Sequence, residues 1–207
     1  MTTAPVSPDY QRFVASVTGP DPQWRESVDV EALLRLEDEE RHEAEVLLID
    51  RLRLDDWRAP PALAEAGARG GVMPMKRRLP LANGRMSIAI ARALAALEAI
   101  PRADEIVAEV LRSGEPDSGL PALVAAEDMK SEPIRDALAW ACLHHPERDV
   151  RCNAGATLFN FANLTTDPLA WSLRPLYLPL GSEDLAVRRA AFEEICKLVG
   201  MPPEIAG

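Results

Sequence analysis

The residues best suited to chemistry in this sequence form one Cys/His group in its second half. Cys142, His144, His145 and Cys152 fall within eleven positions. A zinc site needs four ligands at tetrahedral reach, and spacings such as C-x2-C supply two of them from one turn. The order here is Cys-x-His-His and then Cys after six intervening residues, which matches no common zinc site. We therefore predict no metal site, with Cys142 in a helix core and both histidines at a helix end.

Motifs of catalysis are missing elsewhere in the sequence. Gly67, Gly70 and Gly71 lack the lysine and the preceding strand pattern of a phosphate-binding loop. There is no nucleophile elbow and no His-Glu-x-x-His motif. Pairs of carboxylates do not indicate a catalytic site here, because 33 residues are acidic and many such pairs exist. The sequence therefore predicts no catalytic residue and no cofactor, and it favours a non-enzymatic protein.

Acidic residues are concentrated in one N-terminal segment of the chain. Residues 26–56 carry twelve acids and four arginines, a net charge of −8, in a chain whose formal charge is −10 at pH 7. A negative field repels phosphate groups, so it argues against nucleic acid and anionic membranes and favours a basic protein partner. The candidate docking residues are Glu37, Asp38, Glu39, Glu43 and the flanking Trp57. The alternative interpretation is a solvated charged face.

A second candidate surface lies on a predicted helix that starts near Val150. Asn153 and Asn160 are seven positions apart and therefore share one face of that helix, with Asn163 close to Asn160. Their amides could hydrogen-bond to a protein partner. The alternative is again a solvated face.

The elements that must position these residues are all predicted to be helices. Alanine and leucine are abundant, aromatic residues make up 5% of the chain, and no stretch alternates like a strand. Ser7-Pro8-Asp9 predicts a capped helix start, and the acids of 37–40 interrupt an apolar stripe, so 30–52 should divide into two helices. Further helices are predicted over about 60–66, 86–100, 102–111, 121–129, 133–143, 150–164, 173–180 and 185–199. Residues 68–83 are interpreted as an insertion, without a predicted helix.

The chain also contains an internal repeat. The segment 149–158 begins Asp-Val-Arg, and the segment 184–195 repeats its pattern, with Val187 lying 37 positions after Val150. Weaker copies include Arg41 and Met86, and Pro-Ala-Leu opens the preceding helices at 61–63 and 121–123. Over about residues 30–200 the chain resembles HEAT-repeat proteins of the short-repeat bacterial kind.

This resemblance implies an all-α fold, a right-handed α-α superhelix of about four to five antiparallel helix pairs. We predict an N-terminal extension with a capping helix at 1–28, a repeat domain at 29–200 and a tail at 201–207. In the family the motif arginine commonly pairs with an acid of an adjacent repeat; here these arginines are Arg41, Arg151 and Arg188.

The packing seam between paired helices can also be predicted. Small residues such as Ala154 and Ala191 let two helices approach closely. The branched residues expected to fill the seam are Val150, Leu158, Val187 and Ile195. Trp171, just before the last pair, is expected to be largely buried.

Proteins of this family mostly bind other proteins. We therefore expect a non-catalytic binding protein, more narrowly an inhibitor or immunity-type protein that neutralises a basic partner such as a toxin. The alternatives are a HEAT-like lyase or small-molecule-binding enzyme and, against the acidic composition, a DNA-binding HEAT-like glycosylase. Sparse cysteines and the absence of a signal-peptide or membrane-spanning pattern predict a cytoplasmic protein, a monomer or weak oligomer.

Overall fold

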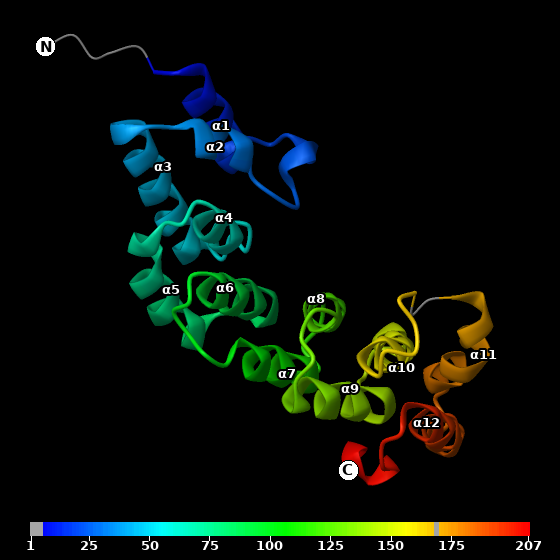
Figure 1. Ribbon diagram of the computed structural model, residues 1–207. Helices are drawn as coiled ribbons and strands as arrows, with labels where there is room; N and C mark the ends of the chain where they lie inside the picture. The colour runs from blue at the N-terminus through cyan, green and yellow to red at the C-terminus, as the bar shows by residue number, and fades with distance from the viewer. Residues whose placement is uncertain (1–5, 168–169) are drawn as a thin grey trace, which may run out of the picture. The chain divides into compact units, whose positions relative to one another are not determined.

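The computed structural model describes residues 6–167 and 170–207. In these ranges it contains twelve α-helices and seven short 3-10 helices and no strand, which confirms the predicted all-α class (Figure 1). The chain divides into two compact units, Met1–Ala103 and Asp104–Gly207. No helix in the described ranges is long and apolar enough to cross a membrane.

The first unit contains six helices, α1 (Pro8–Thr18), α2 (Val30–Arg35), α3 (Asp38–Arg51), α4 (Ala59–Glu65), α5 (Val72–Arg78) and α6 (Gly84–Ala96). Four 3-10 turns accompany them, η1 (Pro22–Trp24), η2 (Leu52–Leu54), η3 (Arg69–Gly71) and η4 (Leu79–Leu81). The helices start and end largely where their sequences predict. Ser7 caps α1 by accepting a hydrogen bond from the backbone N–H of Tyr10, with Pro8 in the first turn.

The predicted break between α2 and α3 is confirmed. Leu36 leaves the helix in an extended conformation, and its side chain is buried. Asp38 follows with a φ of 44°, in the left-handed region that Asp tolerates better than most residues. The acids of 37–40 therefore lie at a new helix start, where the positive end of the helix dipole favours them.

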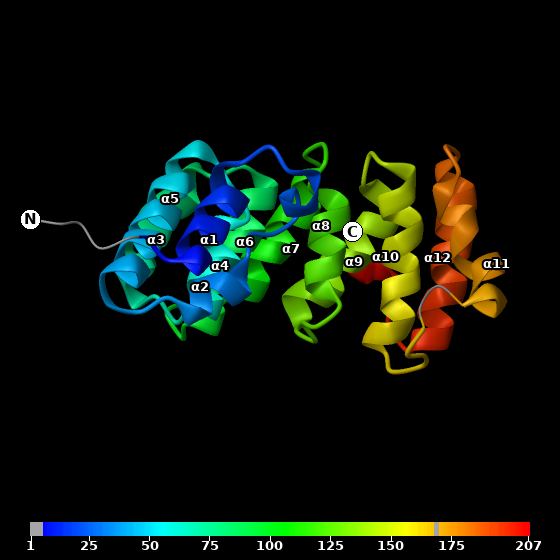
Figure 2. The same cartoon turned by 90° about the horizontal axis from the view of Figure 1, so that it is seen from above.

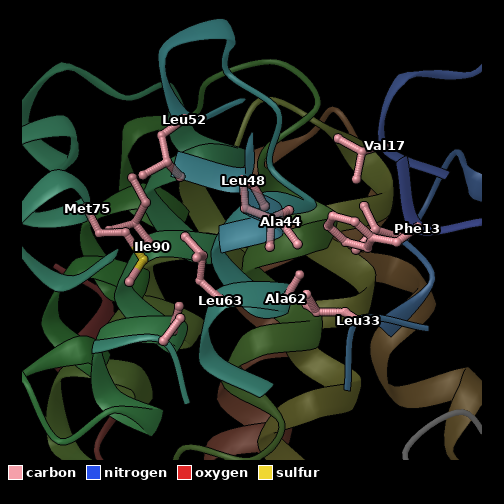
Figure 3. Packing of buried hydrophobic residues seen from close by; sticks show 14 of the residues in the cluster. Phe13, Val17, Leu33, Ala44, Leu48, Leu52, Ala62, Leu63, Met75 and Ile90 are labelled. Carbon is pink, nitrogen blue, oxygen red and sulfur yellow. The ribbon is translucent and has the colours of Figure 1, made fainter. Parts of the chain in front are cut away.

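The core of the first unit is formed by aliphatic side chains with one phenylalanine at its edge (Figure 3). Phe13 of α1 belongs to the same cluster as Leu33 of α2, Leu48 of α3 and Leu63 of α4. Each of these four side chains is fully buried. Burial of such side chains is the main stabilising contribution here, about 1.5–3 kcal/mol each.

The interpretation of residues 68–83 as an insertion without a helix is wrong. The segment holds α5, whose Met75 is fully buried in the core of the first unit. Pro74 is compatible with the helix because it sits in the first turn, where no intrahelical N–H bond is needed.

The second unit contains α7 (Ala103–Ser113), which starts at the unit boundary, α8 (Gly119–Ala126), α9 (Glu132–His144), α10 (Arg148–Phe161), α11 (Arg174–Tyr177) and α12 (Leu185–Val199). Three 3-10 turns complete it, η5 (Trp171–Leu173), η6 (Leu178–Gly181) and η7 (Pro203–Ala206). α10 lies beside α9 on one side and beside α11 and α12 on the other, as Figure 2 shows. The segment predicted as a helix over 173–180 is thus a short α-helix between two 3-10 turns.

The predicted seam is correct for α10 and only partly correct for α12. Val150, Ala154 and Leu158 are buried, as expected. In α12, however, Val187 is 43% exposed and Ala191 is only partly buried. The buried residues there are Phe192, Ile195 and Cys196. The face of α12 that packs is therefore rotated from the one that the repeat register predicts.

One arginine position recurs as the fourth residue of α3, α10 and α12. In the first unit, Arg41 donates from Nη1 to the carbonyl oxygen of Leu33 at 2.7 Å and from Nη2 to that of Ala66 at 2.6 Å. The first carbonyl belongs to the last turn of α2, and the second directly follows α4. One guanidinium therefore joins the C-terminal ends of two helices.

Arg151 repeats this arrangement in the second unit, where it is only 3% exposed. It donates to the carbonyl oxygens of His145 and Pro146, just after α9, at 3.0 and 2.9 Å, and to that of Leu180 in η6 at 3.0 Å. Its Nη2 also contacts the carboxylate of Glu183 at 2.8 Å. Arg151 thus satisfies the exposed carbonyls at two helix ends at once.

The acid pairing implied for these arginines is found only in part. Arg41 pairs with Glu45 of its own helix at 3.1 Å. Arg188 donates to the carbonyl oxygens of Leu143 and Ser182 at 3.0 and 2.9 Å, and no acid pairs with it among the residues that the structure describes. Helix-end carbonyls, which carry partial negative charge, are the main acceptors.

Candidate functional site

The four acids predicted to dock a partner lie together at the start of α3 in the first unit, and we call them the α3 acidic face. Its members are Glu37, Asp38, Glu39 and Glu43. All four side chains are exposed. In the described part of the chain, the first three form no ion pair, whereas Glu43 accepts a hydrogen bond from Tyr10. Burial, and then this hydrogen bond, raises the pKa of Tyr10.

The adjacent Glu40 has a different, structural role. Its carboxylate accepts hydrogen bonds from the backbone N–H of Ser7 at 2.7 Å and from the Ser7 hydroxyl at 2.6 Å. The bond from the Ser7 side chain, and then the one from its backbone, lowers the pKa of Glu40. Glu40 therefore ties the start of α1 to α3 and stays ionised, while its neighbours face solvent.

Exposed aliphatic side chains lie next to these acids. Leu34, near the end of α2, is 55% exposed. Val46 is 43% exposed and follows Glu39 and Glu43 at helical spacing along the same side of α3. Apolar groups among charged ones are the arrangement found in protein-binding surfaces, where the apolar part supplies affinity and the charges supply orientation.

Trp57 does not join the α3 acidic face. It follows η2 beyond the far end of α3, whose 14 residues separate the two by roughly 20 Å. The guanidinium of Arg85 lies over its ring, 3.7 Å from the centroid, and also contacts Glu26 at 2.7 Å. Trp57 is half-buried in this stack, which is a structural role.

The predicted asparagine face is divided between the two ends of α10. Asn160 and Asn163 lie together at its C-terminal end, where Lys130 donates to the Asn160 carbonyl oxygen at 2.9 Å and to the Asn163 side chain. Asn163 has a φ of 57°, typical of a residue that ends a helix. Asn153, by contrast, lines a pocket near the start of α10.

This pocket has a volume of about 250 Å³ and lies between α10 and α11. Its lining includes Arg148, Asp149, Cys152 and Asn153 from α10, together with Arg174 and Tyr177 from α11. The sequence prediction includes Asn153 as a candidate binding residue and Cys152 only as a member of the Cys/His group, and it misses the other residues. The residues from α10 and those from 174–178 lie more than twenty positions apart along the chain, and together they form no recognisable motif.

Two close approaches position the arginines of the pocket. A Cβ atom on Gly181 would lie 2.8 Å from Nε of Arg148, so this side chain runs directly across the glycine backbone. The guanidinium of Arg174 lies 3.8 Å from the ring centroid of Trp171. Trp171 is 80% exposed, so its predicted burial is wrong: the ring lies in η5 and stacks on Arg174 instead of entering a helix seam.

The Cys/His group is divided as well. Cys142 is fully buried in α9, which confirms its core position, and burial raises the pKa of its thiol well above the ordinary value. His145 is buried just after α9; its Nδ1 accepts from the backbone N–H of Glu147 at 3.1 Å, and burial lowers its pKa. His144 contacts the carbonyl oxygen of Ala206 at 3.0 Å. Residues 6–167 and 170–207 hold no group of three or more His, Cys, Asp or Glu that could bind a metal ion.

No protein-family model, curated protein or solved structure matches this chain. Charge is distributed differently in the two units. Residues 1–103 carry sixteen acids and fourteen bases, because residues 57–103 hold eight bases and two acids that offset the acidic segment 26–56. Residues 104–207 carry seventeen acids and nine bases. The α3 acidic face is thus a local concentration of charge in a nearly balanced unit.

Proposed function

We propose that this chain is a non-catalytic, HEAT-type protein-binding protein whose α3 acidic face docks a basic protein partner. The observation that carries the proposal is that Glu37, Asp38 and Glu39 are adjacent, exposed and without ion-pair partners among the described residues, beside the exposed Leu34. Repulsion among such unpaired carboxylates costs stability in the free protein. A basic partner would relieve that repulsion on binding.

The family part of the proposal rests on the recurring arginine. Arg41 and Arg151 each join the C-terminal ends of a preceding and a following helix through carbonyl oxygens. Equivalent contacts at equivalent positions support a repeated helix-pair unit, as in a right-handed α-α superhelix. More narrowly, we propose an inhibitor of the immunity type, because such a role needs a binding surface and no chemistry.

Charge reversal tests the docking surface. Glu37→Lys, Asp38→Asn and Glu39→Lys combined should slow association with the protein that the chain retains from its host lysate by about 10-fold or more at low salt. Asn is chosen at 38 because it tolerates the positive φ. The rate should also lose most of its salt dependence, since screening acts on the same attraction. The measurement is association kinetics at several salt concentrations.

A matched control distinguishes the effect of charge on the α3 acidic face from the effect of the net charge of the chain. Glu109→Lys, Glu127→Gln and Glu193→Lys change the charge by the same amount at exposed positions of the second unit. This variant should associate at close to the wild-type rate. If both variants associate equally slowly, or if neither associates more slowly than the wild type, the α3 acidic face is not the docking surface.

A further inference from the structure

The pocket between α10 and α11 carries two guanidinium groups that the fold does not neutralise. Arg148 and Arg174 both line it, and within 6–167 and 170–207 neither guanidinium forms a hydrogen bond or has a carboxylate partner. Arg41 and Arg151, by contrast, donate hydrogen bonds to carbonyl oxygens at helix ends. Two unpaired guanidiniums in one concave site, within a unit of net negative charge, favour an anionic ligand.

The other polar groups of the pocket limit the charge of that anion. Asp149 contributes one negative charge beside the two arginines, so the lining carries a net charge of +1. Burial raises the pKa of the Cys152 thiol, which therefore stays protonated and adds no charge. A carboxylate would neutralise this lining, whereas a doubly charged phosphate would overcompensate it. Asn153 adds an amide that can donate to a second ligand oxygen.

The walls of the pocket are suited to a flat apolar body. The buried Tyr177 and the more exposed Leu178 line the pocket, and the Trp171 ring lies outside this lining, stacked on Arg174. The volume of about 250 Å³ lies just below the roughly 300–1,000 Å³ of drug-sized ligand pockets, so the ligand must be small. We propose that this pocket binds a small aromatic monocarboxylate, with Arg148 and Arg174 holding its carboxylate.

The Arg148 side chain lies against the backbone of Gly181. The Nε and Cγ atoms of Arg148 lie 2.8 and 3.0 Å from the position of a Gly181 Cβ, so no larger residue fits there without moving the arginine. Arg174 is held by its stack on Trp171. The stack restricts the Arg174 side chain, which lowers the entropic cost of binding through this residue.

Titration of the full-length protein with three probe ligands tests the chemistry, with calorimetry as the readout. Benzoate should bind saturably, and benzamide, which has the same shape without the charge, should bind at least about 10-fold more weakly. Inorganic phosphate should also bind more weakly than benzoate. Equal binding of benzamide, tighter binding of phosphate, or no saturable binding of benzoate would each overturn the proposal.

Single substitutions test the site. Arg148→Gln and Arg174→Gln should each weaken benzoate binding by about 10-fold or more, since each removes a charged donor. Arg189→Gln, at an exposed position of α12 outside the pocket lining, should leave the dissociation constant unchanged. Circular dichroism of each variant confirms its folding. Unchanged binding in both pocket variants would show that benzoate binds elsewhere and would overturn the assignment, without bearing on the α3 acidic face.

Discussion

Replacing Arg151 with methionine is expected to lower the free energy of unfolding by about 3–5 kcal/mol. The guanidinium is only 3% exposed, and it is the donor for the carbonyl oxygens of His145, Pro146 and Leu180. Methionine fills similar space but donates no hydrogen bond, so these carbonyls would remain unsatisfied in a site that water barely reaches. Urea denaturation followed by circular dichroism measures the change.

The control is Arg189→Met, which removes the same charge from an exposed position of α12. Surface substitutions of this kind change stability by within about 0.5 kcal/mol. If Arg151→Met cost less than about 1 kcal/mol, the carbonyl contacts would not hold α9, α10 and η6 together as the structure indicates.

Gly155→Val is expected to lower the free energy of unfolding by about 3 kcal/mol. A Cβ atom at this position in α10 would lie 2.4 Å from Cδ1 of Leu180, 3.2 Å from Cδ1 of Ile195 and 3.3 Å from Cβ of Tyr177. Three elements, α11, η6 and α12, would have to move away from α10. The gain in helix propensity from removing a glycine, less than about 1 kcal/mol, offsets only part of this cost.

Gly70→Val is the matched control for this substitution. Nothing lies within 4 Å of a Cβ atom on Gly70, so the change should be nearly neutral. Thermal unfolding of both variants measures the difference, and Gly155→Ala should fall between them. Equal melting temperatures for Gly155→Val and wild type would contradict the close packing of α10 against η6.

Local sequence signals predicted most of the fold because helix ends are set by neighbouring residues. Ser7-Pro8 starts α1, and the acids of 37–40 start α3, because caps and dipole effects act within one turn. The same signals failed for α5, since no helix is predicted over 68–83, a segment that contains Gly70, Gly71 and Pro74. The proline is harmless in a first turn, and only the burial of Met75 in the core reveals the helix.

The tertiary surroundings of Trp171 and Val187 explain why their predicted burial is wrong. Trp171 is apolar enough for a core, yet a stack on Arg174 keeps it at the surface. Val187 occupies the motif position that is buried at Val150, but no described element covers that face of α12. A repeat register fixes which residues correspond between copies, while the neighbours of each copy decide which of them are buried.

The candidate surfaces differ in how far the sequence could reveal them. Three of the four acids of the α3 acidic face are consecutive in the chain, so their charge could be recognised directly, whereas the hydrogen bonds that Glu40 accepts from Ser7 could not. The pocket joins residues from 148–153 and 174–178, and its unpaired arginines resemble any others in the sequence. Only the packing of α11 on α10 brings them together.

Zero-length carboxyl-to-amine cross-linking of the complex with its retained protein tests most directly whether the α3 acidic face binds a basic partner. Such a reagent joins only groups already in ion-pair contact, and peptide mass spectrometry then identifies both residues. We predict cross-links from Glu37, Asp38 or Glu39 to lysines of the partner, and none from exposed acids of the second unit such as Glu193. Cross-links confined to the second unit would contradict the proposed function.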